Sequence, residues 1–164
     1  MSDDAREKLR DYASTLLEFA GPPPLRLDLR RPVAGRDRAA LQALGVSGAF
    51  AVLTAENPGG DHAEDEPASW KAQREETRNR RRTAGLLDHL EEIGSPALPV
   101  DSVAADGGHR ERCVATPASR AEGVELARRF AQVALLWYDG ERFWLLPALV
   151  DAAPQRLPAE EGAE

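Results

Sequence analysis

The chain of 164 residues has a single cysteine, few aromatic residues and no long apolar run. With Cys113 alone, no disulfide can form within the chain, so its folding has to depend on a packed core. The N-terminus lacks the charged start and apolar stretch of a secretory signal, and no apolar run approaches the ~18 residues of a membrane-spanning helix. We therefore expect a cytoplasmic protein with no membrane partner.

Composition limits the core and the partners further. Aromatic residues make up only 5% of the chain and apolar residues 42%, so we expect one domain with a core of mainly Leu, Val and Ala. The formal net charge of −7 favours solubility and repels polyphosphate, which makes a nucleic-acid partner unfavourable.

Several familiar chemical motifs are also missing from the sequence. There is no GxxxxGK[ST] phosphate loop and no GxGxxG fingerprint, and GVSGA at 45–49 lacks the spacing of a GxSxG nucleophile elbow. His62 lies among Asp61, Glu64 and Asp65, but this spacing matches neither a zinc motif nor a calcium loop. We predict no bound metal and no cofactor.

An amphipathic helix is predicted over residues 1–21. Ser2 before Asp3 and Asp4 is typical of a helix start, and Gly21 followed by three prolines is typical of a helix end. The apolar residues in between recur at helical spacing. They either pack against the rest of the protein or dock a partner.

The remaining pattern predicts an α+β domain over residues 22–150. We expect an edge strand at 25–30, a short helix at 38–44, a central strand covered on both faces at 49–55, and a long helix from 68 or 69 to 94. The first half of that long helix is almost wholly polar, so it is either solvated or faces a ligand.

Two hairpins and a helix complete the predicted fold. One hairpin joins 97–104 to 109–115, a helix runs over 120–131, and Asp139 and Gly140 form the turn of the second hairpin. The expected architecture is a single domain with a mixed central sheet, flanking helices and two C-terminal hairpins. Residues 151–164 are rich in Ala, Pro and Glu and predict a disordered tail.

The first candidate site is the polar turn TAENPGG that follows the central strand. Thr54 offers a hydroxyl, Asn57 an amide, and the Pro and Gly residues a tight turn. Ligands often lie beyond the ends of central strands. An ordinary Asn-Pro turn, in which Asn57 binds only local backbone, explains the same residues equally well.

The second candidate site is the run ETRNRRRT in the long helix. Arg78 and Arg82 are four residues apart with Asn79 between them, so the two guanidinium groups share a helix face and could grip a phosphate or carboxylate. A solvated basic face balanced by the acidic loop before the helix is the simpler interpretation. RNA contact through Arg78 to Arg82 is a third hypothesis.

Three segments together resemble a bacterial family of domains of unknown function, the DUF3293 type, over residues about 49–146. They are a Thr-Ala-x-Asn-Pro turn at 54–58, an Asn-containing helix at Asn79, and an Ala-Arg-x-Phe-x-Gln element that ends at Gln132. The resemblance implies that Asn57, Asn79 and Gln132 converge at one end of the central sheet. It supplies no reaction, and Glu56 stands where relatives often have an aromatic residue.

From these observations we expect the domain to bind a small polar or anionic, nucleotide-like ligand through Thr54, Asn57, Asn79, Arg82 and Gln132. Amides are poor acid-base groups, so catalysis would need Glu56, Glu111 or His109 near them. Whether the protein is an enzyme stays open. The alternative is an interaction module or accessory subunit that docks a protein partner through the N-terminal extension.

Overall fold

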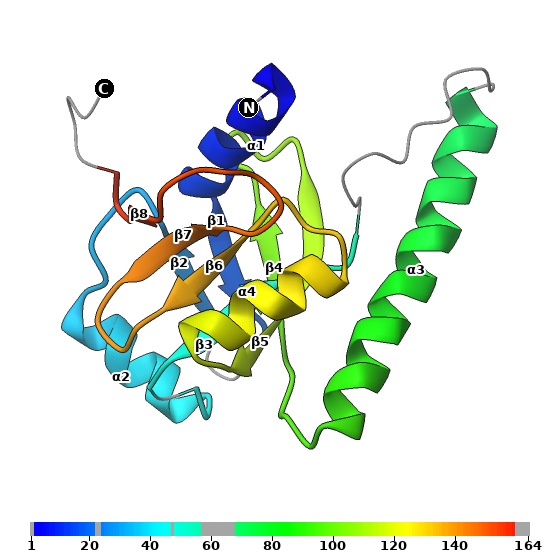
Figure 1. The fold of residues 1–164 in the computed structure, drawn as a ribbon. Coiled ribbons are helices and arrows are strands. Elements are labelled where there is room, and N and C mark those ends of the chain that lie inside the picture. Colours follow the sequence, from blue (N-terminus) through cyan, green and yellow to red (C-terminus); the bar gives the residue numbers. More distant parts are fainter. Residues whose placement is uncertain (1, 22–23, 47, 57–67, 160–164) are drawn as a thin grey trace.

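The computed structural model describes residues 2–21, 24–46, 48–56 and 68–159. Within them the chain forms four helices and one eight-stranded sheet (Figure 1). The helices are α1 (Asp3–Ala13), α2 (Gly35–Ala43), α3 (Ala68–Glu92) and α4 (Arg120–Arg129). The strands are β1 (Leu16–Phe19), β2 (Leu25–Asp28), β3 (Phe50–Leu53), β4 (Leu98–Val103), β5 (Arg110–Pro117), β6 (Ala134–Tyr138), β7 (Phe143–Pro147) and β8 (Gln155–Arg156).

The sheet is curled, and its strand order is β2-β1-β4-β5-β3-β6-β7-β8. The α+β class is confirmed, and so are the edge position of β2 and the two hairpins, β4–β5 and β6–β7. The expected mixed sheet is wrong, because every pairing among the described strands is antiparallel. The strands on either side of β3 follow it in the chain and run opposite to it, so no parallel crossover arises.

β3 is the central strand, as predicted, and lies between β5 and β6. Its four residues are buried and alternate between two cores. Phe50 and Val52 belong to a first core cluster, and Ala51 and Leu53 belong to a second cluster on the other face. Burial on both faces explains why this stretch is apolar at every position instead of at every second one.

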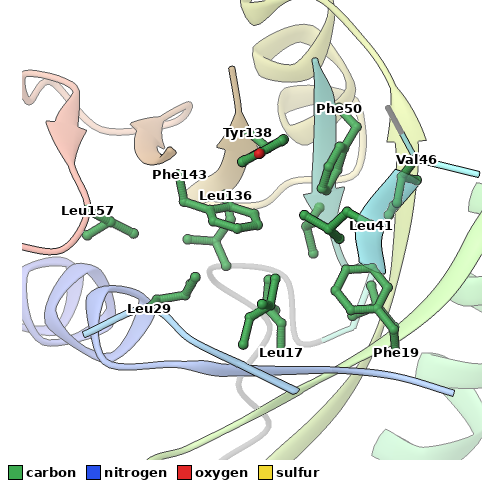
Figure 2. Close-up of a cluster of buried hydrophobic side chains, with 14 of the residues drawn as sticks. Leu17, Phe19, Leu29, Leu41, Val46, Phe50, Leu136, Tyr138, Phe143 and Leu157 are labelled. Carbon is green, nitrogen blue, oxygen red and sulfur yellow. The ribbon is translucent and has the colours of Figure 1, made fainter. Parts of the chain in front are cut away.

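The first core cluster gathers side chains from β1, β3, β6 and β7 with residues of α2, as Figure 2 shows around Leu17, Leu41, Phe50 and Phe143. The aromatic rings of Phe50, Tyr138 and Phe143 contact one another with centroid distances of 5.0 to 5.9 Å. This cluster is the densest aromatic region of the described chain, and α1 packs against it.

The helix predicted over residues 1–21 is shorter than expected. α1 ends at Ala13, where the Thr15 hydroxyl donates to the Asp11 carbonyl, and residues 16–19 form β1 between β2 and β4. Leu17 and Phe19, two residues apart, both enter the first core cluster. The apolar residues of this stretch fit helical and strand spacing equally well over so short a length, and pairing with two neighbours favours the strand.

The tail predicted to be disordered from residue 151 is ordered as far as it is described. Gln155 and Arg156 pair with β7, and the Arg156 guanidinium lies 5.6 Å from the centre of the Trp144 ring. Leu157 enters the first core cluster and is 2% exposed. One well-placed leucine therefore anchors a segment whose composition alone predicts disorder.

The second core cluster lies under α3 and α4. Leu86 and Leu90 of α3 and Leu126 and Ala127 of α4 pack there against β3 and its neighbours. Ser119 is the N-cap of α4 and forms a capping box with Glu122. No helix in the described ranges is both long and apolar enough to cross a membrane.

The C-terminal segment gives a direct test of this packing. Leu157→Ala should lower the free energy of unfolding by about 2–4 kcal/mol, because it leaves a cavity in the first core cluster. Leu149→Ala, at a side chain that is 49% exposed, is the matched control and should change it by less than about 1 kcal/mol. Urea denaturation measures the free energy of unfolding of both variants. Equal effects would contradict the packing of Leu157 in the first core cluster.

Candidate functional site

The Thr54 side chain fixes the backbone of residues 54–56, directly after β3. Its hydroxyl donates to the carbonyl oxygen of Arg112 at 2.8 Å and accepts from the backbone N–H of Glu56 at 3.0 Å. Thr54, Ala55 and Glu56 are all buried. The chain can leave a strand that is buried on both faces only if its backbone groups are satisfied, and the Thr54 hydroxyl satisfies two of them.

Gln132 fixes the same turn from the other side. Its side chain is buried, and its amide nitrogen donates to the carbonyl oxygens of Glu56 at 3.1 Å and Phe130 at 3.2 Å. Because both partners can only accept, the amide nitrogen has to lie on this side. Thr54 and Gln132, two residues of the predicted site, therefore meet at Glu56.

The two predicted residues of α3 lie on its half-buried polar face. An Arg82 guanidinium nitrogen donates to the Asn79 amide oxygen at 3.4 Å, a long contact across one helical turn. Glu75, Arg78 and Thr83 are half-buried on the same side of the helix. One side of the polar first half of α3 is thus half-buried, and the described residues between these positions are exposed. Asn57, the remaining predicted residue, lies outside the described residues.

A cavity of about 720 Å³ lies between α1, the β4–β5 hairpin and α3, and we call it the α1–α3 cavity. Figure 1 shows the hairpin between the two helices. α1 and Thr15 after it contribute one wall, residues from Ser102 to Glu111 of the hairpin contribute the second, and α3 contributes Glu75, Arg78 and Arg82. Among the described residues, Glu56, Gln132 and Val133 also line the cavity.

The cavity brings together part of the predicted site. Arg82 and Gln132 line it. Thr54 and Asn79 do not line it, but they accept hydrogen bonds from the lining residues Glu56 and Arg82. The three groups named for acid-base chemistry, Glu56, His109 and Glu111, also line it. The sequence thus predicted the amide and the cation as parts of one site, and it named the acid-base groups that would have to lie near them.

Two of the carboxylates that line the α1–α3 cavity contact an imidazole or a guanidinium group of the protein. His109 Nε2 lies 2.8 Å from Glu111 Oε1, and Arg112 Nε donates to Glu56 Oε1 at 3.1 Å. The Glu56 side chain is 8% exposed and that of Arg112 is 56% exposed. A buried carboxylate is thus held by one cation on the solvent side, with its other side toward the cavity.

Burial and negative charge keep the nearby hydroxyl and thiol protonated. Burial first, and then Glu111, raises the pKa of Tyr12 above its usual range, so its phenol is a neutral hydrogen-bonding group in the lining. Burial also raises the pKa of the Cys113 thiol to about 12, and Glu111 and Glu56 add to this shift. Cys113 therefore lacks the thiolate that a nucleophile needs.

The α1 wall of the cavity is the part that sequence reasoning missed. Glu7, Lys8 and Asp11 lie on the polar side of α1, and the interpretation concentrated on its apolar side. The available signal was the presence of these three charged residues within a stretch of five. No group of three or more His, Cys, Asp or Glu residues in the described ranges is arranged to hold a metal ion, and His62 lies outside those ranges.

Comparison with known proteins gives one match. The family model described as "Protein of unknown function (DUF3293)" matches residues 53–135, slightly more than half of the chain. Glu56, Arg82, His109, Glu111 and Gln132 lie inside the matched range, and α1 lies outside it. No curated protein and no solved structure matches the chain.

Two threonines test the role of the strand-end turn. Thr54→Val should lower the free energy of unfolding by about 1–3 kcal/mol, because it strands the Arg112 carbonyl and the Glu56 N–H. The Thr83 hydroxyl oxygen is buried with no partner among the described residues, so Thr83→Val should be neutral or stabilising. Chemical denaturation measures the free energy of unfolding of both variants. An unchanged value in Thr54→Val would contradict the role of its hydroxyl in fixing the residues after β3.

The raised pKa of Cys113 predicts slow thiol labelling. Between a thiol pKa of 9.0 and one of about 12, the thiolate fraction at neutral pH differs by about a thousandfold. The folded protein should therefore react with a disulfide reagent about a thousandfold more slowly than the chain in urea, and the single cysteine makes the signal unambiguous. Comparable rates would contradict the raised pKa of the Cys113 thiol.

The same shift has a consequence for stability. The unfolded chain loses its thiol proton near pH 9.0, and the folded chain retains it to about 12, so the stabilisation is complete below 9.0 and is lost as the pH rises toward 12. Tyr12 acts in the same direction.

Proposed function

The chain belongs to the DUF3293 family, whose function is unknown, and we propose that this member binds a small polar ligand in the α1–α3 cavity. The observation that carries the proposal is the convergence of four separate segments on one cavity. Residues 7–15, Glu56, residues 75–82 and residues 102–111 deliver ionisable side chains to a common lining.

The cavity has the size and the fixed walls of a ligand site. Its volume of about 720 Å³ lies within the range of ~300–1,000 Å³ typical of small-molecule sites. The Gln132 amide and the Glu56 backbone are held by hydrogen bonds, and the Glu56 carboxylate is held by Arg112, before any ligand arrives. A site whose polar groups are already oriented loses little entropy when it binds, which favours affinity.

The lining can make both kinds of polar contact. Arg78, Arg82 and Lys8 provide hydrogen-bond donors, and the carboxylates of the lining provide acceptors. His109 and Glu111, in contact at 2.8 Å, provide a pair that can hold a proton beside a ligand. We therefore propose ligand binding as the function. The His109–Glu111 pair would also allow proton transfer to or from a substrate bound in the cavity.

The interaction-module hypothesis depends on an exposed apolar face of the N-terminal helix. Leu9, Tyr12 and Ala13 of α1 pack against the first core cluster instead, and Ala5 is buried. The face that would contact a partner is used inside the protein. This observation supports the cavity as the better basis for a function.

Filling the cavity tests the proposal. The full chain is heated with a panel of nucleotides, nucleosides, amino acids and amines, and a ligand at a hundred times its dissociation constant should add ~2.7 kcal/mol of stability, or a few degrees. Ala104→Trp places a large side chain in the lining and should abolish the shift.

Ala105→Trp is the matched control, because Ala105 is exposed and does not line the cavity. It should retain the shift of the unmodified chain. A shift that survives Ala104→Trp would place binding elsewhere, and a panel with no shift for any compound would count against the proposed function itself.

A further inference from the structure

We propose that the ligand of the α1–α3 cavity carries a cationic nitrogen group, a guanidinium or an ammonium, that binds between Glu56 and Gln132. This inference rests on the proposed function and specifies the chemical class of its ligand. It follows from three features of the lining: two buried acceptor oxygens that no described donor reaches, the balance of charge around them, and the number of donors that the two acceptors can take.

The most buried polar positions of the lining present acceptors. Gln132 is 3% exposed, Glu56 and Thr15 are each 7% exposed, and all three line the cavity. The Thr15 hydroxyl already donates its proton to the Asp11 carbonyl. The Gln132 amide nitrogen is used by two carbonyls, which leaves its oxygen, and Arg112 engages one Glu56 oxygen, which leaves the other. Among the described residues, no donor reaches either remaining oxygen.

Buried acceptors normally have partners, and these two are not sealed inside the protein. Neither oxygen is among the fully buried, unpartnered atoms of the described chain, where the Thr83 hydroxyl oxygen is found. They are therefore accessible, and both residues line the α1–α3 cavity. A ligand group that satisfies them has to bring N–H or O–H donors.

Charge decides between a neutral and a cationic donor group. The described lining holds six carboxylates against three permanent cations. The carboxylates are those of Glu7, Asp11, Glu56, Glu75, Asp106 and Glu111, and the cations are Lys8, Arg78 and Arg82. Of the cations, Arg78 and Arg82 already interact with other groups of the protein. When the Arg112 guanidinium that pairs with Glu56 is counted as a fourth cation, a surplus of negative charge is left, and it attracts a cation and repels a phosphate.

The pair of acceptors suits a group with several N–H donors. A guanidinium offers five donors in a plane and binds a carboxylate through two of them, and a remaining donor can reach an amide oxygen beside it. An ammonium offers three donors and can make the same contacts as a point charge. A phosphate or a carboxylate offers only acceptors and would leave Glu56 and Gln132 unsatisfied.

The test compares ligands that differ in charge and little else. L-Arginine, its decarboxylated form agmatine, and L-citrulline, the neutral analogue of arginine, are titrated into the full chain by calorimetry, with AMP as the anionic probe. We expect arginine or agmatine to bind at least ~10-fold more tightly than citrulline, since truncating one partner of a buried charge pair costs at least that factor.

Matched variants locate the cation. Glu56→Gln keeps the size of the side chain and removes its charge, and it should weaken binding of the cation by at least ~10-fold. Glu92→Gln, on α3 and outside the lining, is the control and should have no effect. In case Glu56→Gln alters the fold, Glu7→Gln combined with Asp11→Asn removes two exposed lining carboxylates from α1, and it should also weaken binding.

The outcomes separate this inference from the proposed function. Equal affinities for arginine and citrulline, or cation binding that is unaffected by Glu56→Gln in a folded protein, would overturn the cationic class. Binding of AMP without binding of arginine or agmatine would overturn it as well. In that last case, loss of AMP binding in Ala104→Trp would leave the α1–α3 cavity as a ligand site.

Discussion

The structure depends on how the chain leaves β3. This strand is covered on both faces, so the residues that follow it start in the interior, where an unpaired backbone group costs about 1–3 kcal/mol. The Thr54 hydroxyl and the Gln132 amide supply the missing partners. These contacts fix the position of Glu56, and Glu56 then brings a buried carboxylate to the cavity beside α1 and α3. Fold and candidate site share this one turn.

Periodicity and turn chemistry were sufficient to predict most elements of the fold. The uninterrupted apolar run of β3, the capping box of α4 and the Asp139 turn each express a local preference that tertiary packing reinforces. Failures occurred where local preference was ambiguous. The stretch from Leu16 to Phe19 becomes a strand because β2 and β4 pair with it, and Leu157 orders its segment through a distant core. Neither partner is visible from neighbouring residues.

For the candidate site, too, local sequence patterns predicted some features and missed those that depend on distant residues. Gln132 could be identified through the resemblance to the DUF3293 type and Arg82 through its helical spacing to Arg78, and His109, Glu111 and Glu56 could be identified as groups able to exchange protons. Their common position depends on the curl of an antiparallel sheet, which places the β4–β5 hairpin between α1 and α3. Strand order at this level is set by long-range pairing. Sequence patterns of single elements therefore give the chemistry of the lining without its geometry.

The ordered C-terminal segment has a further consequence for the edge of the sheet. β7 would present unpaired N–H and C=O groups along its outer side, and such an edge is a template for pairing with another chain. The two residues of β8 cover part of it, and the Leu157 side chain holds them in place from the core. The short β8 strand, the buried Leu157 side chain and the charge of Arg156 together disfavour pairing of this edge with another chain. Loss of the last ten residues would thus affect aggregation as well as stability.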